Sequence, residues 1–158
     1  MSEVIRYLSF FCLIIFNQIL LAINLWPISP DLFLIHTLIY TTFVKKIPNI
    51  YLFIFMGFLI DLFFSNTSIP YTITYFLIGL YLNFSTLKWI QRSLLEQLIL
   101  IISISFCLNI LLFYVNNFSD EMGIRIFINP FLNSMIWVLI FINQRHKCLK
   151  NCLLYTSD

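Results

Sequence analysis

The sequence predicts an all-α, polytopic integral membrane protein, built as a compact bundle of six transmembrane helices with both termini in the cytoplasm. Of the 158 residues, 61% are hydrophobic and only 10% are charged, whereas a soluble domain carries about 25% charged residues. So few charged groups cannot cover a water-soluble globule of this length. Lipid is therefore the expected solvent for most of the surface.

The basic residues predict how the chain crosses the membrane. If the apolar runs are threaded back and forth six times, one side of the membrane receives Arg6, Lys45, Lys46, Lys88, Arg92, Arg145, Lys147 and Lys150. Only Arg125 falls on the other side, in the loop before the last run. Because short loops rich in Lys and Arg stay in the cytoplasm during insertion, the larger group marks the cytoplasmic side.

Prolines, amides and charges divide the chain into six apolar runs. The predicted helices are about 7–25, 32–47, 50–64, 71–87, 94–115 and 126–142. The first run ends at Trp26-Pro27, and no A-x-A cleavage site follows it, so we expect it to stay as an anchor. The second is the shortest, because residues 32–44 rise only ~20 Å against a hydrocarbon core of ~30 Å. Its extension to residue 47 relies on lysine side chains that snorkel to the interface.

The remaining runs are bounded by clearer signals. Pro48 makes the turn into the third run, and a polar loop at 65–70 separates that run from the fourth. The fifth run is the longest. The sixth carries Pro130 near its expected start, where a missing N–H costs little. Residues 143–158 are expected to form a short cytoplasmic tail, and 1–158 a single transmembrane domain.

Asp61 is the most informative polar residue inside an apolar run, because a carboxylate at mid-bilayer costs ~2.5–3.5 kcal/mol. It lies about one turn from the outer end of its run, so it could simply reach the outer interface. The favoured interpretation is a buried anchor that hydrogen-bonds to a neighbouring helix or to a partner protein. Gly57 lies four residues earlier on the same helix face and would let another backbone approach. We expect these two residues to form a helix contact patch.

His36 and Asn17 are the other polar residues that could line a site. A single His in an apolar helix is usually a packing residue, and amides bridge membrane helices at ~1 kcal/mol or less. The alternative is a polar cavity, open to the outer side and lined by Asn17, His36 and Asp61.

Several function classes are disfavoured by the sequence. There is no G-x-S-x-G or H-E-x-x-H pattern, so we expect neither an enzyme nor a cofactor. The bases form no stripe with a stacking platform, so they predict contact with lipid headgroups and no nucleic-acid binding. His146, Cys148 and Cys152 match no zinc-site spacing, so we expect free thiols and no metal.

Three stretches resemble the rod shape-determining protein MreD family. They are residues 26–32 with Trp26-Pro27 and Pro30-Asp31-Leu32, residues 56–62 with Gly57 and Asp61 followed by Pro70 and Gly79, and residues 133–137 with Asn133, Trp137 and then Arg145. They are similar to that family's Pro-rich outer turn, its Gly-x-x-x-Asp-Leu helix and its Asn-x-x-x-Trp final helix. The chain departs from the family pattern at Val138, where a proline is common, and at Ser65-Asn66, where glycines are common.

The resemblance implies a non-catalytic scaffold subunit of the bacterial cell-elongation machinery, which makes peptidoglycan and sets rod shape, in the cytoplasmic (inner) membrane. The implied partner is an MreC-like bitopic protein. Through it, the chain would be linked to MreB filaments and to a RodA-type glycosyltransferase with its penicillin-binding transpeptidase. Gly57 and Asp61 are the implied contact residues, with Asn133 and Trp137 as a second patch.

A second reading stays open. The substrate-binding subunits of energy-coupling-factor vitamin transporters are also compact six-helix proteins, and the polar cavity described above would suit a small ligand. Such subunits often dock through faces of small residues, and this chain has a single Ala, Ala22.

Overall fold

The computed structural model describes residues 3–43, 49–64, 68–85, 89–115 and 120–154, and every regular element in these ranges is helical. In chain order, the elements are α1 (Glu3–Ala22), η1 (Trp26–Ile28), α2 (Leu32–Phe43), α3 (Ile50–Phe64), α4 (Pro70–Phe84), η2 (Trp89–Gln91), α5 (Leu94–Val115) and α6 (Asp120–Leu154). The predicted all-α class is confirmed for these residues.

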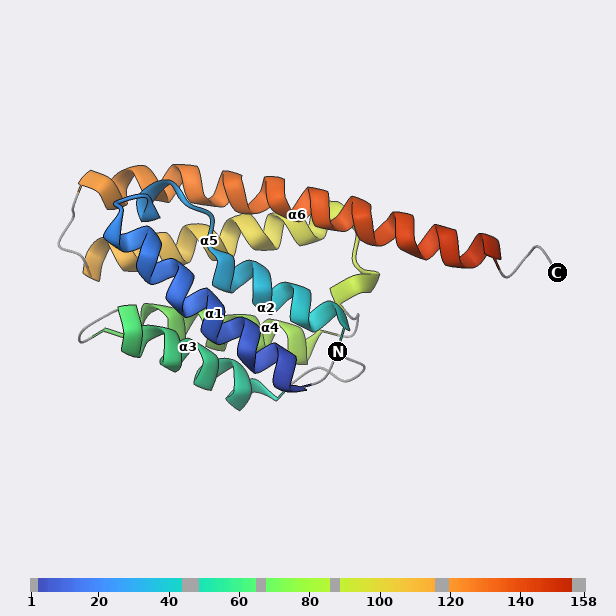
Figure 1. Ribbon diagram of the computed structural model, residues 1–158, viewed down its shortest axis with the longest axis horizontal. Coiled ribbons are helices and arrows are strands. Elements are labelled where there is room, and N and C mark those ends of the chain that lie inside the picture. The colour runs from blue at the N-terminus through green and yellow to red at the C-terminus, as the bar shows by residue number, and fades with distance from the viewer. Residues whose placement is uncertain (1–2, 44–48, 65–67, 86–88, 116–119, 155–158) are drawn as a thin grey trace.

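The six long helices run alternately up and down (Figure 1). The starts of α1, α3 and α5 and the ends of α2, α4 and α6 therefore lie toward one end of the bundle. Helices α3 and α4 pack as a hairpin, α5 packs along α6, and α4 joins the two pairs by contacting α5. In Figure 1 the hairpin lies on the side of the bundle opposite α6, and α6 continues past the other helices at its C-terminal end.

Two predicted helices, 50–64 and 94–115, have the bounds that the structure gives to α3 and α5. The start of α5 is fixed by a capping box, in which the Ser93 N–H donates to Glu96 Oε2 (3.2 Å) and the Glu96 N–H donates to Ser93 Oγ (3.3 Å). The predicted fourth helix, 71–87, is shifted: α4 starts at Pro70 and ends at Phe84, because Ser85 is extended. Residues 86–87 lie outside the described ranges.

The first and second helices also differ from their predicted bounds of 7–25 and 32–47. Helix α1 ends at Ala22, because Asn24 adopts a left-handed conformation with φ 55°. The Leu25 N–H then donates to the Leu20 carbonyl (3.0 Å) and the Asn24 N–H to the Leu21 carbonyl (3.1 Å), which is a Schellman motif. Helix α2 is described only to Phe43, and the predicted extension to residue 47 lies outside the described residues.

Helix α6 is much longer than the predicted helix 126–142. It begins at Asp120, runs through Pro130 and continues to Leu154, so Pro130 lies well inside the helix and not near its start. The predicted tail is helical over 143–154. The early start has a tertiary cause: Arg125, predicted to lie in an outer loop, is only 1% exposed and packs against the α1–α2 connection.

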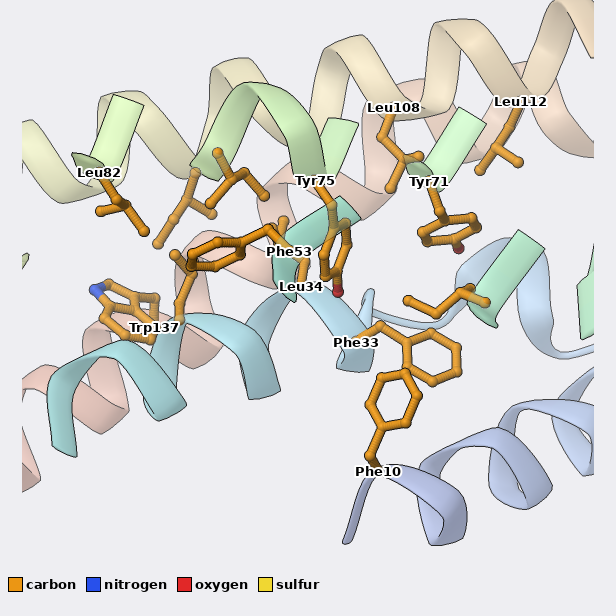
Figure 2. Close-up of a cluster of buried hydrophobic side chains, with 14 of the residues drawn as sticks. Phe10, Phe33, Leu34, Phe53, Tyr71, Tyr75, Leu82, Leu108, Leu112 and Trp137 are labelled. Carbon is orange, nitrogen blue, oxygen red and sulfur yellow. The ribbon is translucent and has the colours of Figure 1, made fainter. Parts of the chain in front are cut away.

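A layer of aromatic side chains joins the helices at the centre (Figure 2). Phe33 of α2 lies between Phe10 of α1 and Tyr71 of α4, with ring centroids 5.7 and 6.2 Å apart, and it meets Phe64 of α3 edge-on at 5.6 Å. Offset and edge-to-face pairs of this kind are the favoured arrangements of buried rings. One phenylalanine of α2 thus connects three other helices.

Two segments are long and apolar enough to cross a membrane, Leu94–Val115 and Gly123–Arg145. Only 28% and 22% of their apolar windows are buried, whereas a core helix of a soluble protein would be mostly buried. Large exposed apolar side chains also occur on α1, α3 and α4, such as Ile15, Tyr51 and Phe84. An apolar exterior of this extent marks a surface that contacts a membrane or another protein.

Candidate functional site: polar side chains inside the bundle

Helix α6 presents one buried face of polar and aromatic residues. Arg125, Asn129, Asn133 and Trp137 follow one another at intervals of four residues, and each is at most 1% exposed. Residues four apart lie on the same side of a helix. Facing them on α5 are three polar residues that are also buried: Gln97, Ser105 and Asn109. The α5–α6 contact therefore holds much of the polarity that the apolar runs contain.

Amides at the centre of this contact form a continuous hydrogen-bonded network. Asn133 Nδ2 donates to Ser105 Oγ (2.9 Å) and to Asn129 Oδ1 (3.0 Å), and Asn109 Nδ2 donates to the same Asn129 oxygen (2.9 Å). Asn129 Nδ2 donates in turn to the Ser29 carbonyl (2.9 Å). We call these residues, together with Asp31 and Arg125, the polar cluster.

The polar cluster fastens the connection between α1 and α2 to α6. Asn133 Oδ1 accepts a hydrogen bond from the Asp31 N–H (2.7 Å), and Arg125 Nη1 donates to the carbonyls of Ser29 (3.2 Å) and Trp26. The Arg125 guanidinium also lies over the Trp26 ring, 3.9 Å from its centroid, which is a cation–π contact. Each partner is about one hundred residues away in the chain.

Asp31 is the acidic member of the polar cluster, and it is 2% exposed. Its Oδ1 accepts from the Leu34 N–H (3.0 Å) and so caps the start of α2. Burial raises the pKa of Asp31 above its ordinary value, while the positive charge of Arg125 and the Leu34 N–H oppose that rise. Three buried atoms of the cluster have no hydrogen-bond partner in the described part of the chain: Asp31 Oδ2, Arg125 Nε and Asn109 Oδ1.

Gly57 and Asp61 lie together at the contact between α3 and α4. A Cβ atom on Gly57 would come within 2.7 Å of Thr72 Cα and of the Tyr71 carbonyl oxygen, so only glycine permits this approach. Asp61 Oδ1 accepts from the Tyr71 N–H (3.0 Å), and its Oδ2 accepts from the Thr72 N–H and the Thr72 hydroxyl (both 2.7 Å). The carboxylate therefore caps α4 from a neighbouring helix, and it is 2% exposed.

Trp137 belongs to a contact at the opposite end of α6's buried face. Its Nε1–H donates to Gln97 Oε1 (2.7 Å), and Gln97 Nε2 donates to the Trp89 carbonyl (3.0 Å). The Trp89 and Trp137 rings pack against each other with centroids 5.7 Å apart. This contact ties η2 to α5 and α6, so both residues of the predicted second patch, Asn133 and Trp137, contact groups of their own chain.

The structure gives different partners to the three residues of the predicted polar cavity. Asn17 Nδ2 donates to the Leu13 carbonyl of its own helix (3.1 Å), and His36 Nε2 pairs with Ser9 Oγ (2.9 Å). Asp61 caps α4. No group of three or more His, Cys, Asp or Glu in the described part of the chain could hold a metal ion. The side chains of His146, Cys148 and Cys152 lie outside the description.

Sequence reasoning missed most of the polar cluster. The four-residue spacing of Arg125, Asn129, Asn133 and Trp137 is visible in the sequence and is the signal that could have found it. Because Arg125 was assigned to a loop, it was not counted on the same helix face as Asn129, Asn133 and Trp137. Comparison with known proteins adds no relative: no family model, curated protein or solved structure matches this chain.

Proposed function

We propose that this chain is a six-span protein of the bacterial inner membrane, with both termini cytoplasmic, that acts as a non-catalytic scaffold of the MreD type in the cell-elongation machinery. Its partner is an MreC-like bitopic protein, which links it indirectly to MreB filaments and to the RodA-type glycosyltransferase with its transpeptidase. The chain offers its partners a rigid binding surface, and the partners carry out the chemistry of peptidoglycan synthesis.

One observation carries this proposal: the three stretches that resemble the MreD family are the places where the bundle is held together. Asp31 of the first stretch is hydrogen-bonded to Asn133 of the third. Gly57 and Asp61 of the second stretch bring α3 against α4. Polar and small residues inside membrane helices generally face helix contacts, and in this chain the three resembling stretches supply them. The resemblance therefore agrees with a shared way of packing six helices.

The burial of these residues refines how a scaffold would use them. Gly57 and Asp61 are buried and Asn133 and Trp137 are at most 1% exposed, so a partner would not touch their side chains. They support the proposed role by fixing the helices, and the contact with a partner helix falls to exposed apolar side chains. A contact made only by apolar side chains in a bilayer depends on close packing of the two surfaces. The polar contacts inside the bundle would therefore serve to hold its outer surface in one shape.

The test is affinity purification of the tagged full chain after cross-linking in living cells of its own host. We expect a bitopic MreC-like protein to be enriched, and we expect depletion of the chain to turn rods into spheres. Normal rods after depletion, with no such protein recovered, would remove the proposal. Surface proteolysis of spheroplasts tests the orientation separately: the C-terminal tail should be protected, and a reporter fused at Asn117 should face the periplasm.

The alternative function, a vitamin-binding subunit of an energy-coupling-factor transporter, is favoured by one feature. Asp31 Oδ2, Arg125 Nε and Asn109 Oδ1 are buried polar atoms without hydrogen-bond partners in the described structure, and a small polar ligand would satisfy such atoms. Depletion separates the two functions, because loss of a vitamin binder would leave rod shape intact in vitamin-rich medium and reduce uptake of one labelled vitamin.

A further inference from the structure

The two sides of the bundle differ in height. Helix α4 has 15 residues, and its neighbours Ile69 (φ −123°, ψ 45°) and Ser85 (φ −77°, ψ 132°) are not helical. Its rise is therefore fixed at ~22 Å, and the 15 residues of α3 give the same value. Helix α5, with 22 residues, rises ~33 Å, and the apolar span Gly123–Arg145 of α6 rises ~35 Å. Figure 1 shows the α3–α4 hairpin stopping short of the long pair.

The short hairpin has an apolar outer surface along its whole length. On α4 the exposed large side chains run from Ile73 to Phe84, and on α3 they run from Tyr51 to Phe63. Asn49 before α3 is exposed, and the sequence after α3 is Ser65-Asn66-Thr67-Ser68, so polar residues flank this surface. The hydrocarbon that contacts the hairpin can therefore be only about as thick as the hairpin is tall, ~22 Å, against ~30 Å for an ordinary bilayer.

We propose that the α3–α4 hairpin is a lipid-facing surface that thins the bilayer beside it, while the bilayer beside α5 and α6 keeps its ordinary thickness. Tilting the protein would not remove the difference, because α4 packs against α5 and the two sides tilt together. A helix shorter than the hydrocarbon core is accommodated by thinning, by snorkelling side chains or by association with another protein. Lys45, Lys46 and Lys88 lie beside the short helices in the sequence. Their long side chains can reach phosphate headgroups, as a locally thinned bilayer requires at the ends of short helices.

This inference rests on the membrane placement in the proposed function and is independent of the scaffold role. Spin labels measure it directly, because oxygen concentrates in hydrocarbon and a nickel chelate in water. In the full chain with its four cysteines changed to serine, single labels are placed at Ile69→Cys and Phe84→Cys, the two ends of α4. Matched controls are Ile124→Cys and Ile142→Cys, ~27 Å apart on α6. All four native side chains are exposed by 50% or more.

In phosphatidylcholine vesicles of ordinary thickness, the two α4 labels should report headgroup depth, although they are the closer pair. The two α6 labels, ~27 Å apart beside a hydrocarbon core of ~30 Å, should report the outer edge of the hydrocarbon. A label at Leu77→Cys, midway along α4, should show a several-fold higher ratio of oxygen to nickel accessibility. A hydrocarbon-depth signal at Ile69→Cys or Phe84→Cys, as deep as at the α6 positions or deeper, would overturn the inference and leave the membrane placement intact. Aqueous signals at Leu77→Cys and at Met135→Cys on α6 would overturn both.

Thermal unfolding of the unlabelled protein gives a second measurement that needs no substitution. Across phosphatidylcholines with acyl chains of about 14 to about 22 carbons, the midpoint should fall steadily once the hydrocarbon is thicker than ~30 Å, because the short hairpin is then mismatched further. A maximum in the thickest bilayers, or a midpoint that does not change across the series, would contradict thinning by the hairpin.

Discussion

Replacing Asp61 with alanine should destabilise the protein strongly, although no partner is present. In the folded chain the Asp61 carboxylate accepts hydrogen bonds from the backbone N–H groups of Tyr71 and Thr72 and from the Thr72 hydroxyl. Asp61→Ala leaves these donors at a buried helix start where water has no access. The carboxylate is 2% exposed, so solvent cannot take its place.

The expected loss follows from the number of donors left without a partner. A buried donor without a partner costs about 1–3 kcal/mol, and loss of an N-terminal cap costs about 0.5–2 kcal/mol. These ranges overlap, because the N–H groups that lose their partner are the capped ones. We therefore expect a loss of about 3 kcal/mol for Asp61→Ala. Asp61→Asn keeps an acceptor oxygen and should lose about 1 kcal/mol.

Reversible unfolding in detergent or bicelles would measure these values. The matched control is Leu62→Ala on the same helix, since Leu62 is 62% exposed and should change stability by less than about 0.5 kcal/mol. Co-purification with the MreC-like partner should fall only in proportion to the folded fraction. If Asp61→Ala were as stable as the parent chain and still lost the partner, the carboxylate would be a partner anchor and the capping argument would be wrong.

Four further outcomes are expected. Gly57→Ala should lower stability by about 2 kcal/mol or more and push α3 away from α4, which lowers the rate of cross-linking between labels on the two helices; an unchanged rate would contradict the close approach. Asn133→Leu removes three hydrogen bonds and should cost about 2 kcal/mol in unfolding experiments, more than the exposed control Met135→Leu. Arg125→Met should cost about 1–3 kcal/mol and speed protease cleavage between α1 and α2, and equal cleavage rates would argue against a fastened connection. Gln97→Leu should cost about 1 kcal/mol and shift the fluorescence of Trp137, whereas an unchanged spectrum would count against that hydrogen bond.

Helix positions in this chain could be read from the sequence where local signals agree. The bounds of α3 and α5 match the prediction, because apolar runs of these lengths are flanked by Asn49 and by the Ser93–Glu96 capping pair. The prediction failed at α6, where Asp120 to Arg125 look like loop residues. Their helical state depends on the burial of Arg125 under Trp26, a contact between residues 99 apart in the chain.

The residues of the candidate site also divide into those that the sequence revealed and those that it did not. Gly57 and Asp61 were found from the sequence, because a glycine one turn from an intramembrane carboxylate is unusual within a single helix. Asp31 and Asn109 were not, since neither residue has a local pattern that sets it apart from a turn or an isolated amide. Their importance comes from neighbours on other helices.

The sequence by itself determined that the chain is helical and that its surface is apolar, because composition and the spacing of polar residues act locally along the chain. Only the tertiary structure decided which polar groups meet. A buried hydrogen bond needs its donor and acceptor within about 3 Å, and Asp31 reaches Asn133 across 102 positions of sequence. The packing of α2, α5 and α6 sets that distance, and no short stretch of residues contains it.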